Sequence, residues 1–351
     1  MARISRDQEH SVPQWLRGSW VVWLVVFMPG VSAVAQRGGP AGAREVTVTE
    51  IPGVVAAGAK WTLAWQGTDN ADGIVGTSDG GLLFAQEQPN RISKLDRNDH
   101  VSVFIENTHG AGAIAIDAKG RVLAVERTCT DPGGHPAECK EATAVGVLAP
   151  DRKVLADSVD GKSLGRLNDL VADKKGGVYF TSGSAYYMNA SGTVTSLGEN
   201  IRSNGIMLSP DEKTLYVTNG ATILAFDVKA DGSTTNRRDF ARLEAPRLGS
   251  GQAGGNGDGM ATDADGRLYV TSAAGVQVFS ADGKYLGVIP TPRNVISVAF
   301  AGPGKRRLYV VGSGALGPDG KEFTTPEGVR NNAKTIYKLP MLARGFAGRA
   351  K

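Results

Sequence analysis

A unit that recurs six times along the chain constrains its fold more than any other feature of the sequence. Each copy has an apolar run, a turn that is usually of the type Asp-x-x-Gly, and a second run that is apolar or aromatic. The copies align on one position of the second run, which is occupied by Leu83, Leu123, Tyr179, Tyr216, Tyr269 and Tyr309. The intervals between these residues average about 45 residues, which is typical of a four-stranded propeller blade.

Further strand-like runs follow the aligned pairs, so that each unit has room for two hairpins. Examples are residues 91–95, 192–197, 222–226 and 276–279. We therefore predict an all-β fold in which residues 45–340 form a single six-bladed β-propeller. We expect the last strands, near residues 335–339, to close the ring with the segment around residues 45–50. No helical period of useful length appears after residue 35.

The composition agrees with many hairpins and excludes several other classes of protein. The chain of 351 residues contains 47 glycines and 16 prolines, more than an average protein, because tight turns consume them. A hydrophobic share of 41% excludes wholesale disorder, and the glycines lack the period of three that collagen requires. The net charge is +4 with both signs interleaved, so we expect no nucleic-acid partner. Residues 341–351 are predicted to form a basic tail.

Residues 1–35 have the pattern of a secretory signal peptide. Three arginines precede the nine apolar residues 20–28, and a small-x-small cleavage sequence ends at Ala35. An apolar run of this length is too short to span a bilayer, although an uncleaved anchor is the alternative. We expect a flexible linker over residues 36–44 and a periplasmic or secreted protein that is monomeric and has no membrane contact after cleavage.

Export determines how the two cysteines are interpreted. Cys129 and Cys139 flank a loop rich in glycine and proline, and in an oxidising compartment such a pair favours a disulfide. A metal site that uses both cysteines and His135 is the alternative, although a fourth ligand is missing.

Four of the six units carry an aspartate or asparagine at the same place, eleven or twelve residues before the aligned position. These residues are Asp72, Asn168, Asn204 and Asp258. Equivalent positions of different blades are related by the pseudo-rotation axis, so these side chains should converge at one mouth of the central channel. Two carboxylates and two amide oxygens suit Ca²⁺, with water completing the shell. The fold prediction therefore includes a central metal-binding channel.

A simpler explanation exists for three of these positions. Asp72, Asn204 and Asp258 each precede a glycine, and such dipeptides are common in turns. The shared register favours the site over the turn. Other Asp-Gly pairs lie between two paired runs and are predicted to be ordinary turns: 79–80, 265–266 and 282–283.

The chain resembles the SMP-30/gluconolactonase/LRE-like family of six-bladed propellers from about Ala71 to Leu339. The resemblance is carried by three sequences: Gly165-Arg-Leu-Asn-Asp169, Ser203-Asn-Gly-Ile206 and Asp258-Gly-Met260. It implies a divalent cation, commonly calcium, with Zn²⁺ or Mn²⁺ as alternatives. The metal ligands of the family fall on Asn204 and Asp258. Asn168 falls near metal and substrate, and Arg166 on a substrate contact. Asp72 stands where the family has a glutamate.

The activity that this resemblance implies is hydrolysis of a small-molecule lactone. The cation would polarise the ester carbonyl, Asp258 would act as metal ligand and general base, and Asn168 and Arg166 would hold the substrate. Two other functions remain open. One is a non-catalytic propeller that binds a sugar or protein around a structural metal. The other is a condensing enzyme similar to strictosidine synthase, and Asn204 together with Asp258 argues against it.

Two further pairs of residues have alternative interpretations. Glu87 and Glu126 end second strands and could reach a pocket, or they could form surface salt bridges. Tyr186 and Tyr187 could line a substrate cleft, although packing within a blade is favoured.

Overall fold

A computed structural model of the chain describes residues 43–127, 142–244 and 256–348. These residues form strands β1 to β26 and one 3-10 turn, Pro303–Lys305. No helix in the described ranges is long and apolar enough to cross a membrane. The predicted signal peptide, most of the predicted linker, and the Cys129–Cys139 pair lie outside the described residues, so these remain predictions.

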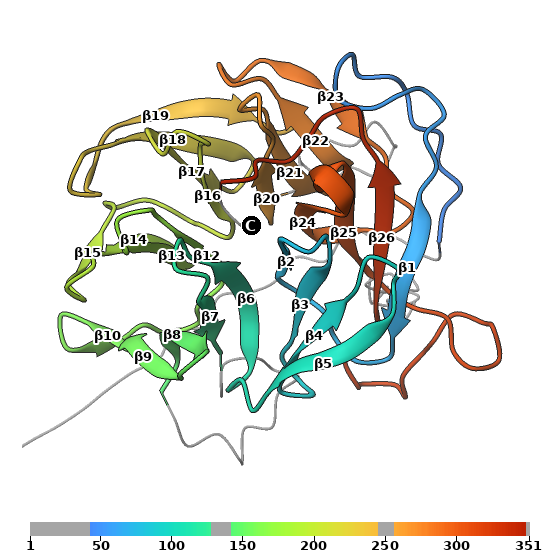
Figure 1. Cartoon of the computed structure of the whole chain (residues 1–351), viewed down its shortest axis with the longest axis horizontal. Helices are drawn as coiled ribbons and strands as arrows, with labels where there is room; N and C mark the ends of the chain where they lie inside the picture. The colour runs from blue at the N-terminus through green and yellow to red at the C-terminus, as the bar shows by residue number, and fades with distance from the viewer. Residues whose placement is uncertain (1–42, 128–141, 245–255, 349–351) are drawn as a thin grey trace, which may run out of the picture. The chain divides into compact units, whose positions relative to one another are not determined.

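Six antiparallel four-stranded sheets surround a central axis, and the first strand of each blade lies innermost (Figure 1). Blade 1 contains β2 (Ile74–Gly76), β3 (Leu82–Gln86), β4 (Arg91–Leu95) and β5 (Val101–Glu106). Blade 2 contains β6 (Ala111–Ile116), β7 (Val122–Glu126), β8 (Ala144–Ala149) and β9 (Lys153–Ala156). A small hairpin, β10 (Ser158–Val159) with β11 (Lys162–Ser163), precedes blade 3. Blade 3 contains β12 (Leu170–Ala172), β13 (Val178–Ser182), β14 (Ser184–Met188) and β15 (Val194–Ser196).

The remaining blades follow the same order. Blade 4 contains β16 (Ile206–Leu208), β17 (Thr214–Asn219), β18 (Thr222–Val228) and β19 (Thr234–Arg242). Blade 5 contains β20 (Met260–Thr262), β21 (Leu268–Ser272), β22 (Gly275–Phe279) and β23 (Tyr285–Ile289). Blade 6 contains β24 (Val295–Ala301), β25 (Arg307–Ser313), β26 (Lys334–Pro340) and, from the other end of the chain, β1 (Thr62–Gly67). The predicted six-bladed propeller is confirmed.

The strand that closes the ring is β1, which pairs antiparallel with β26. The expectation that residues 45–50 would close the ring is therefore wrong. Val48 and Ile51 are buried in one apolar cluster with Tyr269 of blade 5 and Leu308 of blade 6. The early segment is thus held by its side chains against the propeller, and the strand that pairs with β26 lies further along the chain.

The aligned aromatic residues explain how neighbouring blades pack. The four aligned tyrosines are at most 2% exposed. The hydroxyl of Tyr179 in blade 3 donates to the carbonyl of Gly232 in blade 4 at 2.5 Å. The ring of Tyr269 in blade 5 contacts that of Phe300 in blade 6 edge-on, with centroids 4.9 Å apart. Buried aromatic side chains of this kind contribute much of the stability of a core. The aligned position of the repeat therefore marks residues that pack between blades.

Tyr186 and Tyr187 belong to the same packing. Tyr187 is 5% exposed and stacks on Tyr179, and Tyr186 stacks on Phe180. Packing within and between blades therefore accounts for both residues, as favoured from the sequence.

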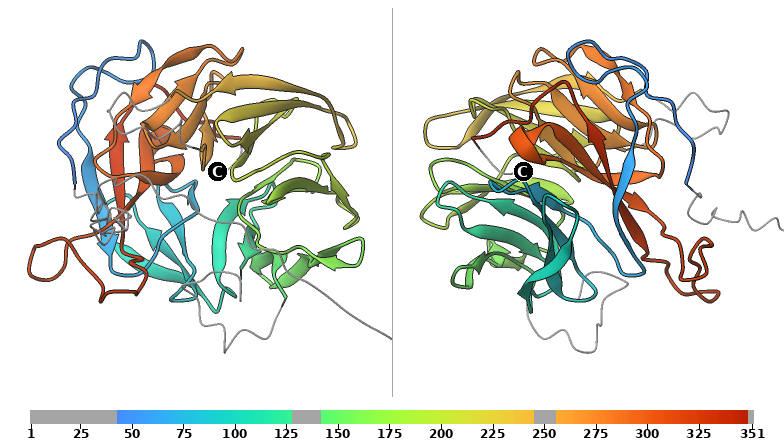
Figure 2. Two further views of the ribbon diagram at one scale, coloured as in Figure 1. Left: turned by 180° about the vertical axis from the view of Figure 1, so that it is seen from behind. Right: turned by 45° about the vertical axis from the view of Figure 1, so that its right-hand side comes forward.

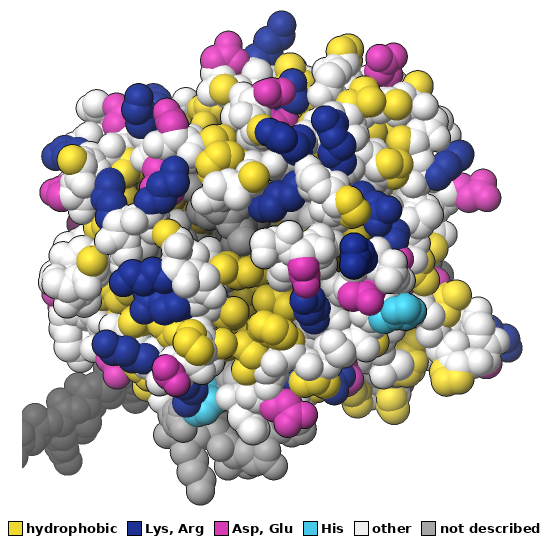
Figure 3. All heavy atoms as spheres, viewed as in Figure 1, with side chains coloured by type: hydrophobic (Ala, Val, Ile, Leu, Met, Phe, Trp, Pro, Cys, Tyr) yellow, Lys and Arg dark blue, Asp and Glu magenta, His cyan; other side chains and the backbone are white. Residues whose placement is uncertain are grey.

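The C-terminal segment turns back across one end of the propeller (Figures 1 and 2). The amides of Leu342 and Ala343 both donate to the carbonyl of Val54, and the amide of Phe346 donates to that of Thr262. Up to Gly348, the segment predicted to be a basic tail therefore packs on the propeller. On the face that this segment crosses, lysine and arginine side chains are interspersed with acidic ones (Figure 3).

The Asp-Gly and Asn-Gly dipeptides fall into two structural classes. The glycines predicted to lie in turns have positive φ angles, at Gly80, Gly266 and Gly283. Gly73, Gly205 and Gly259 are not among the described glycines with positive φ. A Cβ on Gly205 would overlap the carbonyl oxygen of Asp258, and one on Gly73 would lie 2.5 Å from Cα of Ala113. These glycines let the innermost strands of adjacent blades approach, so the turn explanation does not hold for them.

We expect Gly205→Ala to lower the free energy of unfolding by about 3 kcal/mol, because the added Cβ must push two blade backbones apart. Gly161 is a matched control, since its φ is +72° and nothing lies within 4 Å of an added Cβ. Gly161→Ala should cost only backbone strain, about 1 kcal/mol. Urea denaturation measures both values. Equal losses in the two variants would contradict the close-approach account.

Candidate functional site

The four residues predicted to converge lie at one end of the central channel, each just before an innermost strand. We call them the ring residues: Asp72 precedes β2, Asn168 precedes β12, Asn204 precedes β16 and Asp258 precedes β20. Arg127 contacts the first two, and the side chains of the last two share a hydrogen bond. The charge of Asp72 also acts on Asp258. The structure thus brings together all four side chains.

Arg127, directly after β7, is the site residue that sequence reasoning missed. Its side chain is 5% exposed. Nη1 donates to Oδ2 of Asp72 at 2.5 Å, and Nη2 donates to the backbone oxygen and to Oδ1 of Asn168 at 2.5 and 3.2 Å. Nη1 also lies 3.5 Å from Oε2 of Glu87, which is buried rather than on the surface.

Burial alone would lower the pKa of Arg127. The carboxylates of Asp72 and Glu87 outweigh that effect and hold the pKa above its ordinary value. The guanidinium is therefore a permanent positive charge inside the site.

The repeat contained a pattern that could have revealed Arg127. Glu87 and Arg127 occupy the same position in blades 1 and 2, four residues after the aligned leucines. Blades 3, 4 and 5 have small residues at that position: Gly183, Gly220 and Ala273. Charged side chains therefore fill one half of the channel mouth, and the other half is left open.

Asn204 and Asp258 form the half of the ring that Arg127 does not contact directly. Asp258 as a residue is half-buried, but its carboxyl group is deep enough for burial to raise its pKa well above the ordinary range. The nearby charges of Asp72 and Asp169 raise it further, whereas Arg127 and a hydrogen bond from Asn204 oppose them. A cation bound nearby would therefore stabilise the carboxylate form of Asp258.

Oδ1 of Asn204 is buried and accepts no hydrogen bond from the described part of the chain. An acceptor oxygen left without a donor costs free energy, and a cation beside Asp258 would satisfy it. Both groups are hard oxygen donors of the kind that Ca²⁺ prefers. Among the described residues, no three His, Cys, Asp or Glu side chains are grouped to hold a metal, so a metal bound here would need further oxygen ligands such as amides, backbone carbonyls or water.

Buried threonines at the ends of second strands hold the ring backbone in blades 3 to 5. Thr181, Thr218 and Thr271 share one position of the repeat and are all fully buried. Oγ1 of Thr218 accepts from the amides of Asn204 and Gly205 at 2.9 and 2.8 Å. This explains why the second runs of these blades contain Thr, where the same position in blades 1 and 2 is apolar.

Arg166 and Asp169 belong to the same short sequence as Asn168, but their side chains have different surroundings from that of Asn168. Arg166 is exposed, and among the described residues its side chain makes no hydrogen bond or ion pair with the ring. Its role as a substrate contact stays a prediction. Asp169 is buried and accepts from the amides of Leu170 and Ile206, so it ties blade 3 to blade 4.

A pocket of about 390 Å³ opens beside Asn204 on the unfilled half of the mouth. Its floor includes three glycines, and its polar lining is Arg202, Ser203, Asn204 and Asn256. A volume of this size holds a small molecule, and glycines let a ligand approach the backbone closely. This pocket is the candidate substrate site.

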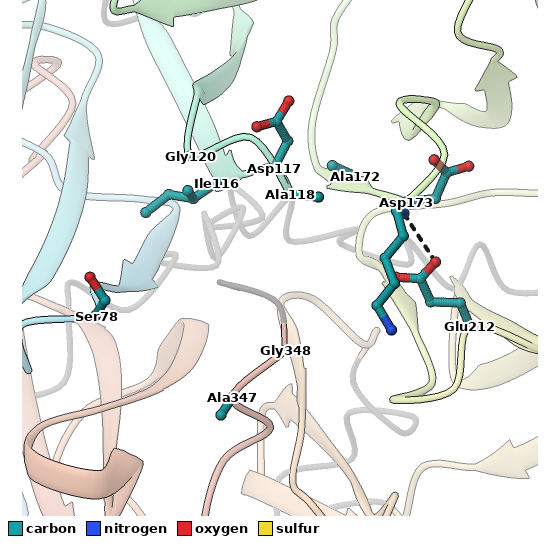
Figure 4. A pocket seen from close by; sticks show the side chains of 11 residues that line it. Ser78, Ile116, Asp117, Ala118, Gly120, Ala172, Asp173, Glu212, Ala347 and Gly348 are labelled. Carbon is teal, nitrogen blue, oxygen red and sulfur yellow. Dashed lines mark hydrogen bonds between the residues drawn. The ribbon is translucent and has the colours of Figure 1, made fainter.

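A second pocket, of about 310 Å³, lies where the innermost strands end, whereas the ring residues precede these strands; Figure 4 shows the residues that line it. It is lined by turns that follow the innermost strands and by the C-terminal segment, including Asp117, Asp173 and Glu212. Each of these carboxylates already has a structural partner: Arg121, Tyr187 and the amide of Lys174, respectively. These contacts account for the three carboxylates as residues that stabilise the turns.

The model of the SMP-30/gluconolactonase/LRE-like region matches residues 70–314. Gluconolactonase from Zymomonas mobilis is 24% identical over 66% of this chain and 72% of its own length. Pentonolactonase XacC from Haloferax volcanii is 29% identical over 57% of this chain and 70% of its own.

The solved structure of a gluconolactonase from Xanthomonas campestris superimposes with a TM-score of 0.66 at 22% identity, covering 87% of this chain and 98% of that one. A calcium-binding regucalcin from Agrobacterium tumefaciens superimposes with a TM-score of 0.60 at 18% identity, covering 82% and 95%. At these identities the structural likeness supports the fold.

The threonine contact generates a prediction about the rigidity of the ring. Thr218→Val keeps the volume but removes the acceptor for two buried amides, so the free energy of unfolding should fall by about 1–3 kcal/mol. Hydrogen exchange at Asn204 and Gly205, followed by mass spectrometry, should become faster. Thr218→Ser keeps the hydroxyl and should leave that exchange unchanged. Faster exchange in both variants would mean that the methyl group, rather than the hydroxyl, holds the ring.

Proposed function

This chain belongs to the SMP-30/gluconolactonase/LRE-like family, and from that premise we propose that it is a metal-dependent hydrolase that opens a lactone ring. The names of its relatives, gluconolactonase and pentonolactonase, support the class of reaction. The single structural observation that carries the proposal is the pair formed by Asn204 and Asp258. A buried amide oxygen without a donor lies near a desolvated carboxylate, and Asn204, which carries that amide, also lines an open pocket.

Asn204 and Asp258 would hold the divalent cation. Calcium is the ion that their oxygen donors favour. When bound, the ion would polarise the ester carbonyl and make the attacking water more acidic. The chain contributes the position of its two ligands, which Thr218 and the close approach of Gly205 to Asp258 fix.

Asp258 would also accept the proton from the water that attacks the carbonyl carbon. The bond between this carbon and the ring oxygen then breaks, and the ring oxygen takes up a proton to give a hydroxy acid. Oδ1 of Asn168 is turned toward Arg127, which leaves the NH₂ end of the amide for a hydroxyl or the ring oxygen of the substrate. Arg166, exposed two residues earlier, would contact the outer part of the substrate.

We also propose that the protein is exported. The support is the sequence of residues 1–35, with its apolar run and the small residues before Ala35. Mass spectrometry of protein recovered from the periplasm should find Gln36 as the first residue. Full-length protein retained in the cytoplasm would contradict the proposal.

Replacement of the proposed base tests the chemistry. Asp258→Asn should lower kcat/KM for an aldonolactone by about 100-fold or more, since general base catalysis typically contributes that much. Asp265→Asn is the matched control, because Asp265 is a largely exposed turn residue of the same blade whose side chain forms an ion pair with Arg267. Its rate should stay within about twofold of the wild type. Assays with a pH indicator on a panel of aldonolactones and aliphatic lactones provide the rates.

If the wild-type protein with saturating calcium hydrolyses none of these lactones, the proposed activity is wrong. A non-catalytic propeller that binds a ligand around its metal would then account for the same site.

Removal of the metal tests the other half of the proposal. At a calcium concentration 100 times Kd, binding should stabilise the folded protein by about 2.7 kcal/mol, so EDTA should lower Tm measurably. Asn204→Ala should abolish this calcium-dependent shift, because it removes one of the two proposed ligands. A Tm that calcium and EDTA leave unchanged would show that the folded protein binds no such ion.

A further inference from the structure

Blade 2 contributes no polar side chain at the ring position. Gly112 occupies that position, and a Cβ there would overlap Cζ and Nε of Arg127. Because Gly112 has no side chain, the guanidinium of Arg127 can occupy the space where one would lie. Arg127 follows β7, and its side chain extends to the ring position of blade 2, where it takes the place of a ring side chain.

From this place the guanidinium contacts the ring residue of each neighbouring blade. Its two terminal nitrogens donate to Asp72 of blade 1 and to Asn168 of blade 3. The rigid fork of an arginine suits such a double contact, and Glu87 adds a second carboxylate 3.5 Å away. Two of the four oxygen-bearing ring side chains are therefore already paired with a positive charge.

We propose that Arg127 is a built-in cation that holds Asp72 and Asn168 and thereby confines the divalent ion to Asn204 and Asp258. Asp72 is then the counter-ion of Arg127 and not a metal ligand. Arg127 is a positioning residue, and the inference rests on the proposed function only in taking a divalent ion to bind at this mouth of the channel.

The charges in the ring give this arrangement a measurable consequence. Arg127 repels a dication in the same channel, and it neutralises a carboxylate that would otherwise attract one. Loss of the guanidinium charge should therefore strengthen calcium binding, the opposite of what loss of a ligand does. Damage to the fold would also weaken binding, so the direction of the change separates the proposed role from a merely structural one.

Isothermal titration of the full-length protein with CaCl₂ tests the proposal. Asp72→Asn should leave Kd within about threefold of the wild type, whereas Asp258→Asn should weaken binding by about tenfold or more, because only the second removes a ligand charge. Arg127→Met should tighten binding by about tenfold, and adding Asp72→Asn to it should reverse the gain. Arg127→Lys keeps the charge and should stay close to the wild type.

Two results would overturn the proposal. One is an Asp72→Asn variant that loses as much affinity as Asp258→Asn, which would make Asp72 a ligand. The other is an Arg127→Met variant that folds, as judged by its thermal melt, and binds calcium no more tightly than the wild type. If Arg127→Met does not fold, the comparison of the two aspartate variants decides alone.

Lactone assays separate this inference from the proposed function. A protein that binds calcium independently of Asp72 but hydrolyses no lactone supports the role of Arg127 and contradicts the activity. A protein that hydrolyses lactones but needs Asp72 as strongly as Asp258 for calcium binding supports the activity and overturns the role of Arg127.

Discussion

The pairing of β1 with β26 is the interaction on which the rest of the structure depends. It joins strands from the two ends of the propeller in one sheet, and so closes six blades into a ring. Closure brings the starts of the innermost strands to one mouth, although the ring residues Asp72 and Asp258 are far apart in the chain. Gly73, Gly205 and Gly259 then allow neighbouring backbones to approach closely enough for the ring side chains to meet.

The balance between acidic and basic side chains at the channel mouth determines where a cation could bind. Asp72, Glu87 and Asp258 bring three carboxylates to a poorly solvated place, and Arg127 supplies one positive charge within contact of the first two. Among the described residues Asp258 forms no direct ion pair, and its pKa rises because its carboxyl group is buried and lies near the charges of Asp72 and Asp169. Small residues such as Gly183 and Gly220 keep the adjacent half of the mouth open. The proposed cation site and the candidate substrate pocket therefore lie on the same side of the axis.

The sequence predicts the number of blades and the ring residues because both are periodic. Tyr179 and Tyr269 contact the neighbouring blades, and the polar residues lie eleven or twelve residues before the aligned positions. The closing strand was not predictable in this way, since β1 lies outside the repeats and pairs across the whole chain. Arg127 was missed because it acts on residues that are distant from it in sequence: it fills the space over Gly112 of its own blade and contacts Asn168 of blade 3.

We propose that one divalent ion binds to Asn204 and Asp258 at the channel mouth. The most direct measurement is an anomalous difference map from crystals of the protein soaked in Mn²⁺, which scatters anomalously and accepts the same oxygen ligands. We expect one peak within bonding distance of Oδ1 of Asn204 and a carboxylate oxygen of Asp258, with Arg127 still between Asp72 and Asn168. A channel without a peak, or a peak bound to Asp72 with the guanidinium of Arg127 displaced, would contradict it.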